Sequence, residues 1–177
     1  MTFIQHYDSP LGGILLAADE IGLTGLWFDG QKYFARGLSS EREERELPVL
    51  LEAKRWLDIY FTGKEPDFLP PLHPVGSAFR QLVWELLLQV PYGKTTTYGE
   101  IACKLAEKQK LPRMSAQAVG GAVGHNEISI IIPCHRVVGT NGSLTGYAGG
   151  IERKIVLLCL EGADTARFRI PKKGTAL

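Results

Sequence analysis

The sequence predicts an α+β protein of two domains: a small strand-plus-helix domain over residues 1–76 and a mainly helical domain over residues 77–177. Short strand patterns precede the first helical pattern, residues 64–76 contain four prolines, and the charge changes sign at the same point. Residues 1–76 carry a net charge of −5 and residues 77–177 one of +6. A basic half beside an acidic half is typical of a polyanion-binding module with a companion domain, although an accident of surface residues would give the same balance.

The composition is that of an ordinary globular protein, with 45% hydrophobic and 22% charged residues among 177. No apolar run approaches the length of a membrane span, and the N-terminus lacks the basic and apolar regions of a signal peptide. Three cysteines without CxxC spacing suit a reducing compartment and argue against a disulfide framework or a zinc cluster. We therefore expect a cytoplasmic protein, or a nuclear one in a eukaryote, that has no metal, no other cofactor and no membrane partner.

The first domain is expected to hold short strands and one amphipathic helix. The strands are predicted at residues 3–7, 13–18 and 22–28, where turn residues separate them. Pro48 suits a first helical turn, and Gly63 stands where a C-terminal cap is expected. Between them the apolar residues recur at helical spacing: Val49, Leu50, Ala53, Trp56, Leu57 and Tyr60. The prolines of residues 64–76 then predict a stiff linker.

Three helices are predicted next, each with its own start signal. Ser77 and Ser115 are expected N-caps, and Thr97 with Glu100 forms a capping box. The first helix has an apolar stripe of Phe79, Leu82, Val83, Leu86, Leu87 and Val90. The second and third are joined by a short connection that contains Pro112, and this order within the basic half predicts a helix-turn-helix.

The third helix is unusually poor in large side chains. Its small residues are Ala116, Ala118, Gly120, Gly121, Ala122 and Gly124, and the inner face is expected to hold Ala116, Val119, Gly120 and Val123. Each glycine lowers helix propensity by about 1 kcal/mol, so stability alone does not explain the composition. A smooth helix allows another backbone to approach closely. That backbone is equally well a DNA strand or a neighbouring helix.

Residues 128–138 are the stretch most suggestive of chemistry. A run of isoleucines predicts a buried strand that ends at Pro133, directly before Cys134, His135 and Arg136. A thiol becomes a nucleophile as the thiolate, which nearby positive charge favours, but a buried cysteine is as often a small hydrophobic residue. In an extended chain neighbouring side chains point to opposite sides, so a direct Cys134–His135 pair requires a turn at Pro133 or a bridging water.

After this stretch the sequence predicts a hairpin and a last helix. Asn141-Gly142 is a strong hairpin signal and indicates a two-stranded wing. The last helix is expected at 151–161, with Ile155, Leu158 and Cys159 buried. Glu161 lies in its final turn, where the helix dipole disfavours a carboxylate. That placement indicates either a specific partner or a simple surface acid.

The segment Pro133-Cys134-His135-Arg136-Val137, followed by Gly142 and by residues 146–150, resembles the O6-alkylguanine-DNA alkyltransferases. The resemblance is close over residues 77–162 and general over the first 76. It implies a ribonuclease H-like first domain and a winged helix-turn-helix second domain. It also implies the chemistry: Cys134 as nucleophile, His135 as general base through a water, and Glu161 orienting the imidazole. By the same resemblance Tyr98 donates toward the leaving guanine, and Lys154 belongs to the same environment.

The resemblance further implies the substrate and the way it is bound. The partner is double-stranded DNA that carries O6-alkylguanine or O4-alkylthymine, and the damaged nucleotide is rotated out of the stack. The protein acts once per molecule, because the product is a thioether, and is expected to be a monomer. DNA contacts are expected from Thr97, Ser115, Gln117, Ala118, Gly121 and Arg136, with Lys108, Lys110 and Arg113 as candidates for phosphate contacts. The substrate pocket is expected to involve Asn126, Tyr147, Ala148 and Gly149.

One position departs from the family pattern, and two other functions deserve comparison. Gln117 stands where the family has an arginine that fills the gap left by the flipped base, and glutamine lacks the charge and the stacking plane of a guanidinium. An alkyltransferase-like protein that binds the lesion without transfer would lack the cysteine, whereas Cys134 is present. A helix-turn-helix regulator does not explain the Cys-His-Arg segment, and a Cys-His hydrolase does not explain the small-residue helix.

Overall fold

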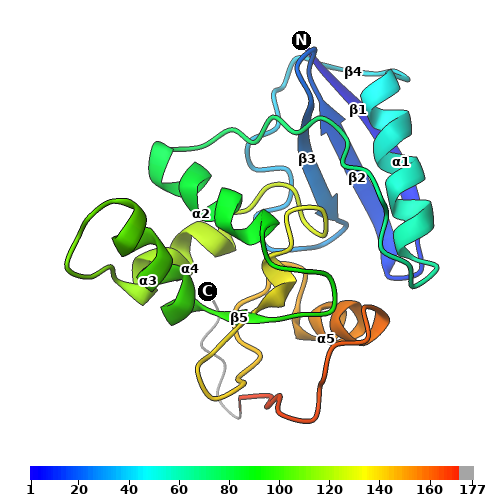
Figure 1. Cartoon of the computed structure of the whole chain (residues 1–177). Coiled ribbons are helices and arrows are strands. Elements are labelled where there is room, and N and C mark those ends of the chain that lie inside the picture. Colours follow the sequence, from blue (N-terminus) through cyan, green and yellow to red (C-terminus); the bar gives the residue numbers. More distant parts are fainter. Residues whose placement is uncertain (172–177) are drawn as a thin grey trace. The chain divides into compact units, whose positions relative to one another are not determined.

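The computed structural model describes residues 1–171, which form two compact units. The first comprises residues 1–75 together with 127–131, and the second residues 76–126 together with those from 132 onward. Both units combine helices with β-structure, so the predicted α+β class is confirmed (Figure 1). None of the helices in the described residues is long and apolar enough to cross a membrane.

The first unit is a four-stranded sheet with one helix against it. The strands are β1 (Thr2–Ser9), β2 (Gly12–Ala18), β3 (Leu23–Phe28) and β4 (Arg42–Glu44), in the order β3-β2-β1-β4. The first three pair antiparallel and β4 pairs parallel with β1. Helix α1 (Pro48–Tyr60) contacts β1, β2 and β3. Of the apolar residues that the helical spacing predicted, all are buried except Val49, which is half-buried. The core of this unit lies between the sheet and the helix.

Part of the proline-rich segment is bound to this unit. The Leu23 amide donates to the Pro71 carbonyl, and the His73 amide donates to the Leu23 carbonyl, each at 2.8 Å. His73 Nδ1 also lies 2.6 Å from Asp19 Oδ2. Residues 71–73 therefore continue the hydrogen bonding of β3, and this part of the segment is fixed by backbone contacts as well as by proline stiffness.

The strand predicted to end at Pro133 is not formed, and this is a correction. Ile128 makes a single bridge to Leu26, after which the chain turns back at Ile130, whose φ is +68°. The Ile131 amide closes this turn on the Ser129 carbonyl at 2.8 Å. The isoleucines are all buried. The apolar run thus indicated burial correctly, but a short run of this kind does not distinguish a strand from another buried conformation.

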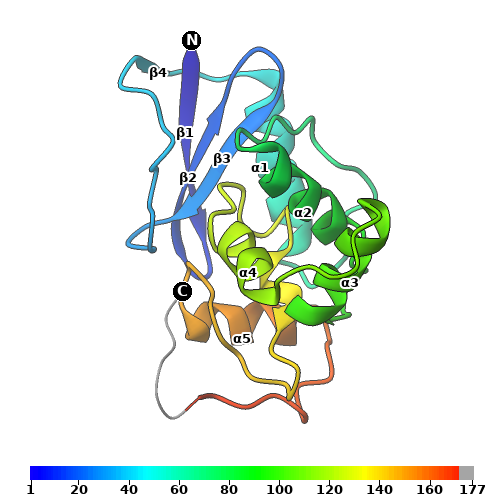
Figure 2. The ribbon, with the colours of Figure 1, turned by 90° about the vertical axis from the view of Figure 1, so that its left-hand side faces the viewer.

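The second unit has helices α2 (Ala78–Leu88), α3 (Tyr98–Lys108), α4 (Ala116–Gly124) and α5 (Ile151–Leu160). The predicted caps are present: Ser77 and Ser115 accept from the first turn of α2 and α4, and Thr97 and Glu100 form the capping box of α3. Helix α4 contacts both α2 and α3 (Figure 2). Trp84 of α2 donates its indole N–H to the Ala122 carbonyl at 3.0 Å, a close approach that the small residues of α4 permit. Ala116, expected on the inner face, is exposed instead because it opens the helix.

The expected two-stranded wing is also corrected. Gly142 has a φ of +78°, and the Gly139 amide donates to the Ser143 carbonyl at 2.8 Å, so the predicted turn is present. Within residues 1–171 no hairpin strands flank it. Instead β6 (Val137–Val138) pairs parallel with β5 (Thr96–Thr97), and Ser143 bridges Arg169. On α5, Leu158 is buried as expected and Ile155 is half-buried. Cys159 is exposed, so the burial predicted for it is wrong.

Candidate active site

A short 3₁₀ helix, η1 (Cys134–Arg136), presents the thiol and the imidazole. The Cys134 amide donates to the Ile132 carbonyl, and the Arg136 amide to the Pro133 carbonyl. The chain therefore turns at Pro133, and Cys134 and His135 do not have the opposite orientations of an extended chain. Cys134 is 5% exposed. Asn126 lies beside it, with Nδ2 3.2 Å from Sγ and 2.8 Å from the Ile132 carbonyl oxygen.

His135 is fully buried and held by a carboxylate. Its Nε2 lies 2.7 Å from Glu161 Oε1. Since the ionised carboxylate only accepts, the proton is assigned to Nε2, and Nδ1 carries the lone pair. Nδ1 is buried and has no hydrogen-bond partner among residues 1–171. The ring thus has one nitrogen fixed by Glu161 and one acceptor nitrogen in the interior.

Glu161 is the C-cap of α5, and its carboxylate accepts hydrogen bonds from three residues of the second unit. Besides His135, the donors are Nε and Nη2 of Arg136, each at 2.9 Å, and the Gly93 amide at 3.2 Å. Burial alone would raise the pKa of Glu161, but the hydrogen bonds and charges of His135 and Arg136 outweigh it and lower the pKa to about 2. The carboxylate is therefore ionised at neutral pH. Glu161 therefore lies at the end of α5 with specific partners, and it is not the solvated surface acid that was the alternative.

Arg136 is directed into the protein. It is 8% exposed, its third donor group reaches the Val90 carbonyl at 2.8 Å, and its guanidinium lies 5.7 Å from the centre of the Tyr92 ring. This placement is at odds with the DNA contact expected of Arg136, because its guanidinium donors already have protein acceptors. The residue type suggested DNA, but the positions of its partners were not readable from the sequence.

Lys154 and Tyr98 meet at one backbone carbonyl. Lys154 is fully buried, and Nζ donates to the carbonyls of Val137 at 2.6 Å and Thr145 at 2.9 Å. The Tyr98 hydroxyl donates to the same Thr145 carbonyl at 3.2 Å. Burial lowers the pKa of Lys154 to about 8 and raises that of Tyr98 to about 12. Both side chains therefore carry their donor protons at neutral pH.

Burial and nearby charges set the protonation states of Cys134 and His135 before any substrate is bound. Burial raises the pKa of Cys134, while the Asn126 hydrogen bond and the Lys154 charge act in the opposite direction. Burial lowers the pKa of His135, although Glu161 opposes this shift. At neutral pH the structure thus pairs a protonated thiol with a neutral imidazole. A neutral imidazole is the form that accepts a proton.

The structure gathers most of the predicted DNA-contacting residues on one helix. Ser115, Gln117 and Ala118 are exposed in and before the first turn of α4, and Gly121 has open space where a side chain would project. Thr97 is half-buried as the N-cap of α3. The cations Lys108, Lys110 and Arg113 are exposed before α4.

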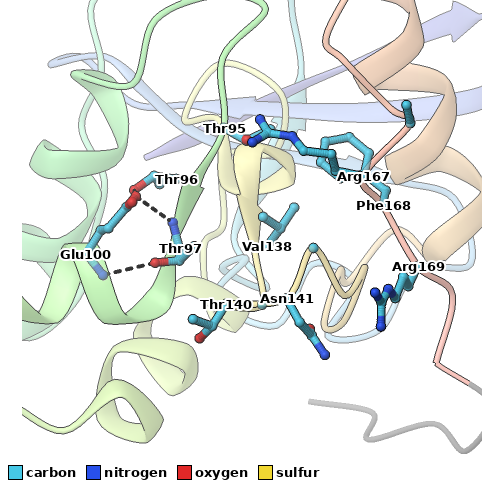
Figure 3. Close-up of a pocket in the computed structure, with 13 residues that line it drawn as sticks. Thr95, Thr96, Thr97, Glu100, Val138, Thr140, Asn141, Arg167, Phe168 and Arg169 are labelled. Carbon is cyan, nitrogen blue, oxygen red and sulfur yellow. Dashed lines mark hydrogen bonds between the residues drawn. The ribbon is translucent and has the colours of Figure 1, made fainter.

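Two of the four predicted pocket residues lie beside η1. Asn126 contacts Cys134, and the Tyr147 ring centre is 6.4 Å from that of His135 with the planes at 73°. Gly149 is buried and Ala148 half-buried. A groove of about 500 Å³ in the same unit is formed by different residues. Its walls come from β5, the turn after β6 and residues 166–169, with Glu100 tied to Thr96 and Thr97 on one side (Figure 3). Cys134 does not line this groove.

Several contributors to the site were missed by sequence reasoning. The carbonyls of Val90 and Thr145 and the Gly93 amide are backbone groups, which have no residue-type signal. Gly93 alone had a local signal, the Pro-Tyr-Gly turn, and a Cβ at this position would lie 2.9 Å from the Glu161 carbonyl oxygen.

A buried thiol with an adjacent imidazole–carboxylate pair, in the unit that contains the packed helices α3 and α4, is typical of a protein that uses a cysteine nucleophile. Comparison with known proteins specifies it further. Residues 3–74 match the ribonuclease-like domain of 6-O-methylguanine DNA methyltransferase, and residues 78–163 match its DNA binding domain. The chain belongs to this family, which confirms the resemblance inferred from the sequence.

Relatives and solved structures agree over almost the whole chain. The methylated-DNA–protein-cysteine methyltransferase of Haemophilus influenzae is 39% identical, over 97% of this chain and 96% of that protein. The protein of the same name from Methanosarcina acetivorans is 44% identical, over 89% and 96%. A crystal structure of Mycobacterium tuberculosis OGT in complex with DNA is 40% identical, covers 94% of each chain and has a TM-score of 0.76.

Proposed function

We propose that this protein repairs alkylated DNA by direct reversal, moving the alkyl group of O6-alkylguanine to the sulfur of Cys134. The observation that carries the proposal is the buried arrangement at η1. A shielded thiol lies next to a neutral histidine whose Nε2 is fixed by Glu161 and whose Nδ1 is an uncommitted acceptor. The matches to the family and to a relative solved with DNA support both the reaction and DNA as the partner.

The first step is loss of the thiol proton. Because burial raises the pKa of Cys134, a base is required at neutral pH, and His135 Nδ1 is the acceptor through a bridging water. Glu161 keeps the ring oriented and stabilises the imidazolium that forms. The charge of Lys154 and the amide of Asn126 favour the thiolate.

The second step is an in-line displacement. A bond forms between Sγ and the alkyl carbon, the bond from that carbon to guanine O6 breaks, and its electron pair stays with the guanine. The proton removed from the thiol is balanced by the proton that the guanine ring gains. Tyr98 is the donor proposed to stabilise the leaving base. To do so, its hydroxyl gives up the hydrogen bond to the Thr145 carbonyl and donates to the guanine instead. The thioether is not cleaved under mild conditions, so each molecule reacts once.

DNA recognition is assigned to the surface around α4. We infer DNA contacts from Ser115, Gln117, Ala118 and Gly121, and from Thr97 at the start of α3. The flipped nucleotide is proposed to enter toward Asn126 and the segment 147–149. Arg136 takes a structural role at Glu161 in place of a DNA contact. We further propose that residues 77–177 carry the DNA-binding and transfer activities, of which 172–177 lie outside the described residues.

Three further properties are proposed from the chemistry. The protein acts as a monomer, since every proposed reacting group comes from one chain. It works where thiols stay reduced, in the cytoplasm or, in a eukaryote, in the nucleus. O4-alkylthymine is a second candidate substrate, because it offers the same type of alkyl carbon.

The test is intact-protein mass spectrometry after incubation with a duplex that contains O6-methylguanine. We expect one methyl group per protein, located on the peptide with Cys134, and no turnover. Cys134→Ala should abolish the transfer while duplex binding remains, and Cys159→Ala, at an exposed thiol of α5, is the matched control that should still react. Binding without any added mass in the wild type would refute transfer and leave a lesion-binding protein.

A further inference from the structure

In the interior, Glu161 accepts hydrogen bonds from both the imidazole of His135 and the guanidinium of Arg136. Oε1 accepts from both His135 Nε2 at 2.7 Å and Arg136 Nη2 at 2.9 Å, while Oε2 accepts from Arg136 Nε at 2.9 Å. The guanidinium therefore makes a bidentate pair with the carboxylate, which is the strongest geometry for such a pair. The side chain of Glu161 is fully buried and that of Arg136 is 10% exposed, so solvent screens this pair weakly.

The guanidinium is fixed on its other sides as well. Nη1 donates to the Val90 carbonyl at 2.8 Å, and the Tyr92 ring lies beneath the group. Arg136 cannot move away from Glu161 without leaving that carbonyl. The positive charge is thus a permanent feature of the site.

This charge matters because of what Glu161 alone would do to His135. A buried carboxylate 2.7 Å from an imidazole favours the imidazolium, and an imidazolium cannot accept the thiol proton. The other charged or titratable groups around the ring are Cys134 and Arg136 on η1 and Lys154 on α5, and the Tyr147 ring packs at its edge. Burial is the largest influence that keeps the ring neutral, and the charges of Arg136 and Lys154 act in the same direction. Glu161 opposes them by favouring the imidazolium, and Arg136 is the cation bound directly to Glu161.

We propose that Arg136 is a positioning residue for the transfer reaction: by pairing with both oxygens of Glu161 it offsets the carboxylate charge, so that His135 stays neutral with Nδ1 ready to accept the proton. The inference rests on the proposed role of His135 as the base. Glu161 then orients the ring without charging it in the resting state. A carboxylate without the guanidinium would both orient the imidazole and favour its charged form. With Arg136 bound to it, Glu161 orients the imidazole and favours the charged form less.

A purely structural Arg136 would join η1 to the Val90–Gly93 turn and affect only stability. The two roles differ in the titration of His135. In Arg136→Met no guanidinium offsets the carboxylate charge beside the imidazole, so we expect the pKa of His135 to rise by about one pH unit or more. The acidic limb of the rate–pH profile should move by the same amount, which is a loss of about tenfold in transfer rate on that limb. Arg136→Lys keeps the charge and should restore most of the wild-type profile.

The experiment combines NMR titration of the four histidines with single-turnover transfer rates between about pH 5 and 8, on variants whose folding is confirmed by circular dichroism. His135 is assigned by its loss in His135→Gln. In Arg136→Met/Glu161→Gln the carboxylate charge is gone as well, and we expect the upward shift to disappear. A folded Arg136→Met protein in which His135 titrates as in the wild type would overturn the inference. If Arg136→Met unfolds, the shift is sought in Arg136→Gln, and its absence there overturns the inference equally.

Failure of the inference is distinguishable from failure of the proposed function. Wild-type protein that leaves Cys134 unmethylated refutes the function, whatever the titrations show. Wild-type protein that transfers the methyl group while the Arg136 variants keep the wild-type profile refutes only the role of Arg136.

Discussion

At the scale of single residues, burial and charge act on Cys134 in opposite directions. Removal of the thiol from water raises its pKa, and the ammonium of Lys154 together with the Asn126 amide limits that rise. Lys154 is itself fully buried and held by two carbonyls, so its charge has a fixed position. The thiol is thereby kept protonated at rest, and in the proposed mechanism the Lys154 charge and the Asn126 amide stabilise the thiolate that forms when His135 accepts the proton.

Lys154→Met is expected to raise the pKa of Cys134 further and to slow transfer at neutral pH by about tenfold or more, which corresponds to about 1.4 kcal/mol. The thiolate absorbance in the ultraviolet, followed against pH, reports the first effect, and single-turnover rates report the second. Lys104→Met, at an exposed lysine of α3, is the control and should change neither. An unchanged Cys134 titration in Lys154→Met would show that the ammonium does not assist the thiolate.

At the scale of elements, the end of α5 is joined to η1 and to the Gly93 turn through one carboxylate. The pKa of Glu161 lies near 4.5 in the unfolded chain and at about 2 in the folded protein. A lowered pKa means that the unfolded chain binds more protons between these values, so stability rises with pH across that window. The contribution, about 3 kcal/mol, is fully present above pH 4.5 and is lost as the pH falls through about 2.

Glu161→Gln should therefore lower the free energy of unfolding by about 3 to 5 kcal/mol at pH 7, because it removes one partner of a buried ion pair. The difference from the wild type should shrink as the pH falls from about 4.5 toward 2. Urea unfolding at several pH values measures this. Glu152→Gln, at an exposed acid in the first turn of the same helix, should have little effect. A constant difference at all pH values would contradict the lowered pKa.

The exposed start of α4 leads to a prediction about base flipping. Gln117→Arg adds a charge and a planar group that can stack where the flipped base leaves a gap. We expect the transfer rate on duplex DNA to rise by up to about tenfold, equivalent to about 1.4 kcal/mol, while reaction with the free base O6-methylguanine stays the same. Both rates are measured by single-turnover assays. An equal change on the two substrates would place residue 117 outside the flipping step.

Elements whose conformation depends on nearby residues could be predicted from the sequence, and those that depend on distant contacts could not. The helices and their caps depend on residues within a few positions, and Ser77, Ser115 and the Thr97–Glu100 box formed as expected. The isoleucine run was wrong as a strand because its conformation depends on a bridge from Ile128 to Leu26, about one hundred residues away. In the candidate site the structure brings together Cys134, His135 and Glu161, which the sequence analysis had proposed as one unit. The sequence analysis assigned Arg136 to DNA, because the partners that hold it, Glu161 and the Val90 carbonyl, are distant along the chain. The sequence alone does not show whether an arginine binds a phosphate or a buried carboxylate.

At the scale of the whole molecule, the two halves of the chain differ in charge, with −5 over residues 1–76 and +6 over residues 77–177. Association with DNA should therefore weaken as salt rises, because bound cations release counterions from the duplex. The connection between α3 and α4 adds Lys110 and Arg113, both exposed. If each contacts a phosphate, it contributes about 0.9 to the slope of log K against log salt.

Lys110→Gln/Arg113→Gln should lower the magnitude of that slope by about 2 and should weaken binding similarly for damaged and undamaged duplexes, since phosphate contacts read no sequence. Fluorescence anisotropy of a labelled duplex over a range of salt concentrations measures both quantities. Arg42→Gln/Lys64→Gln, which removes two exposed cations from the acidic half, is the matched control and should leave the slope unchanged. Equal losses in the two double variants would mean that net charge alone governs the association. A loss confined to the first variant would locate the phosphate contacts on the connection that precedes α4.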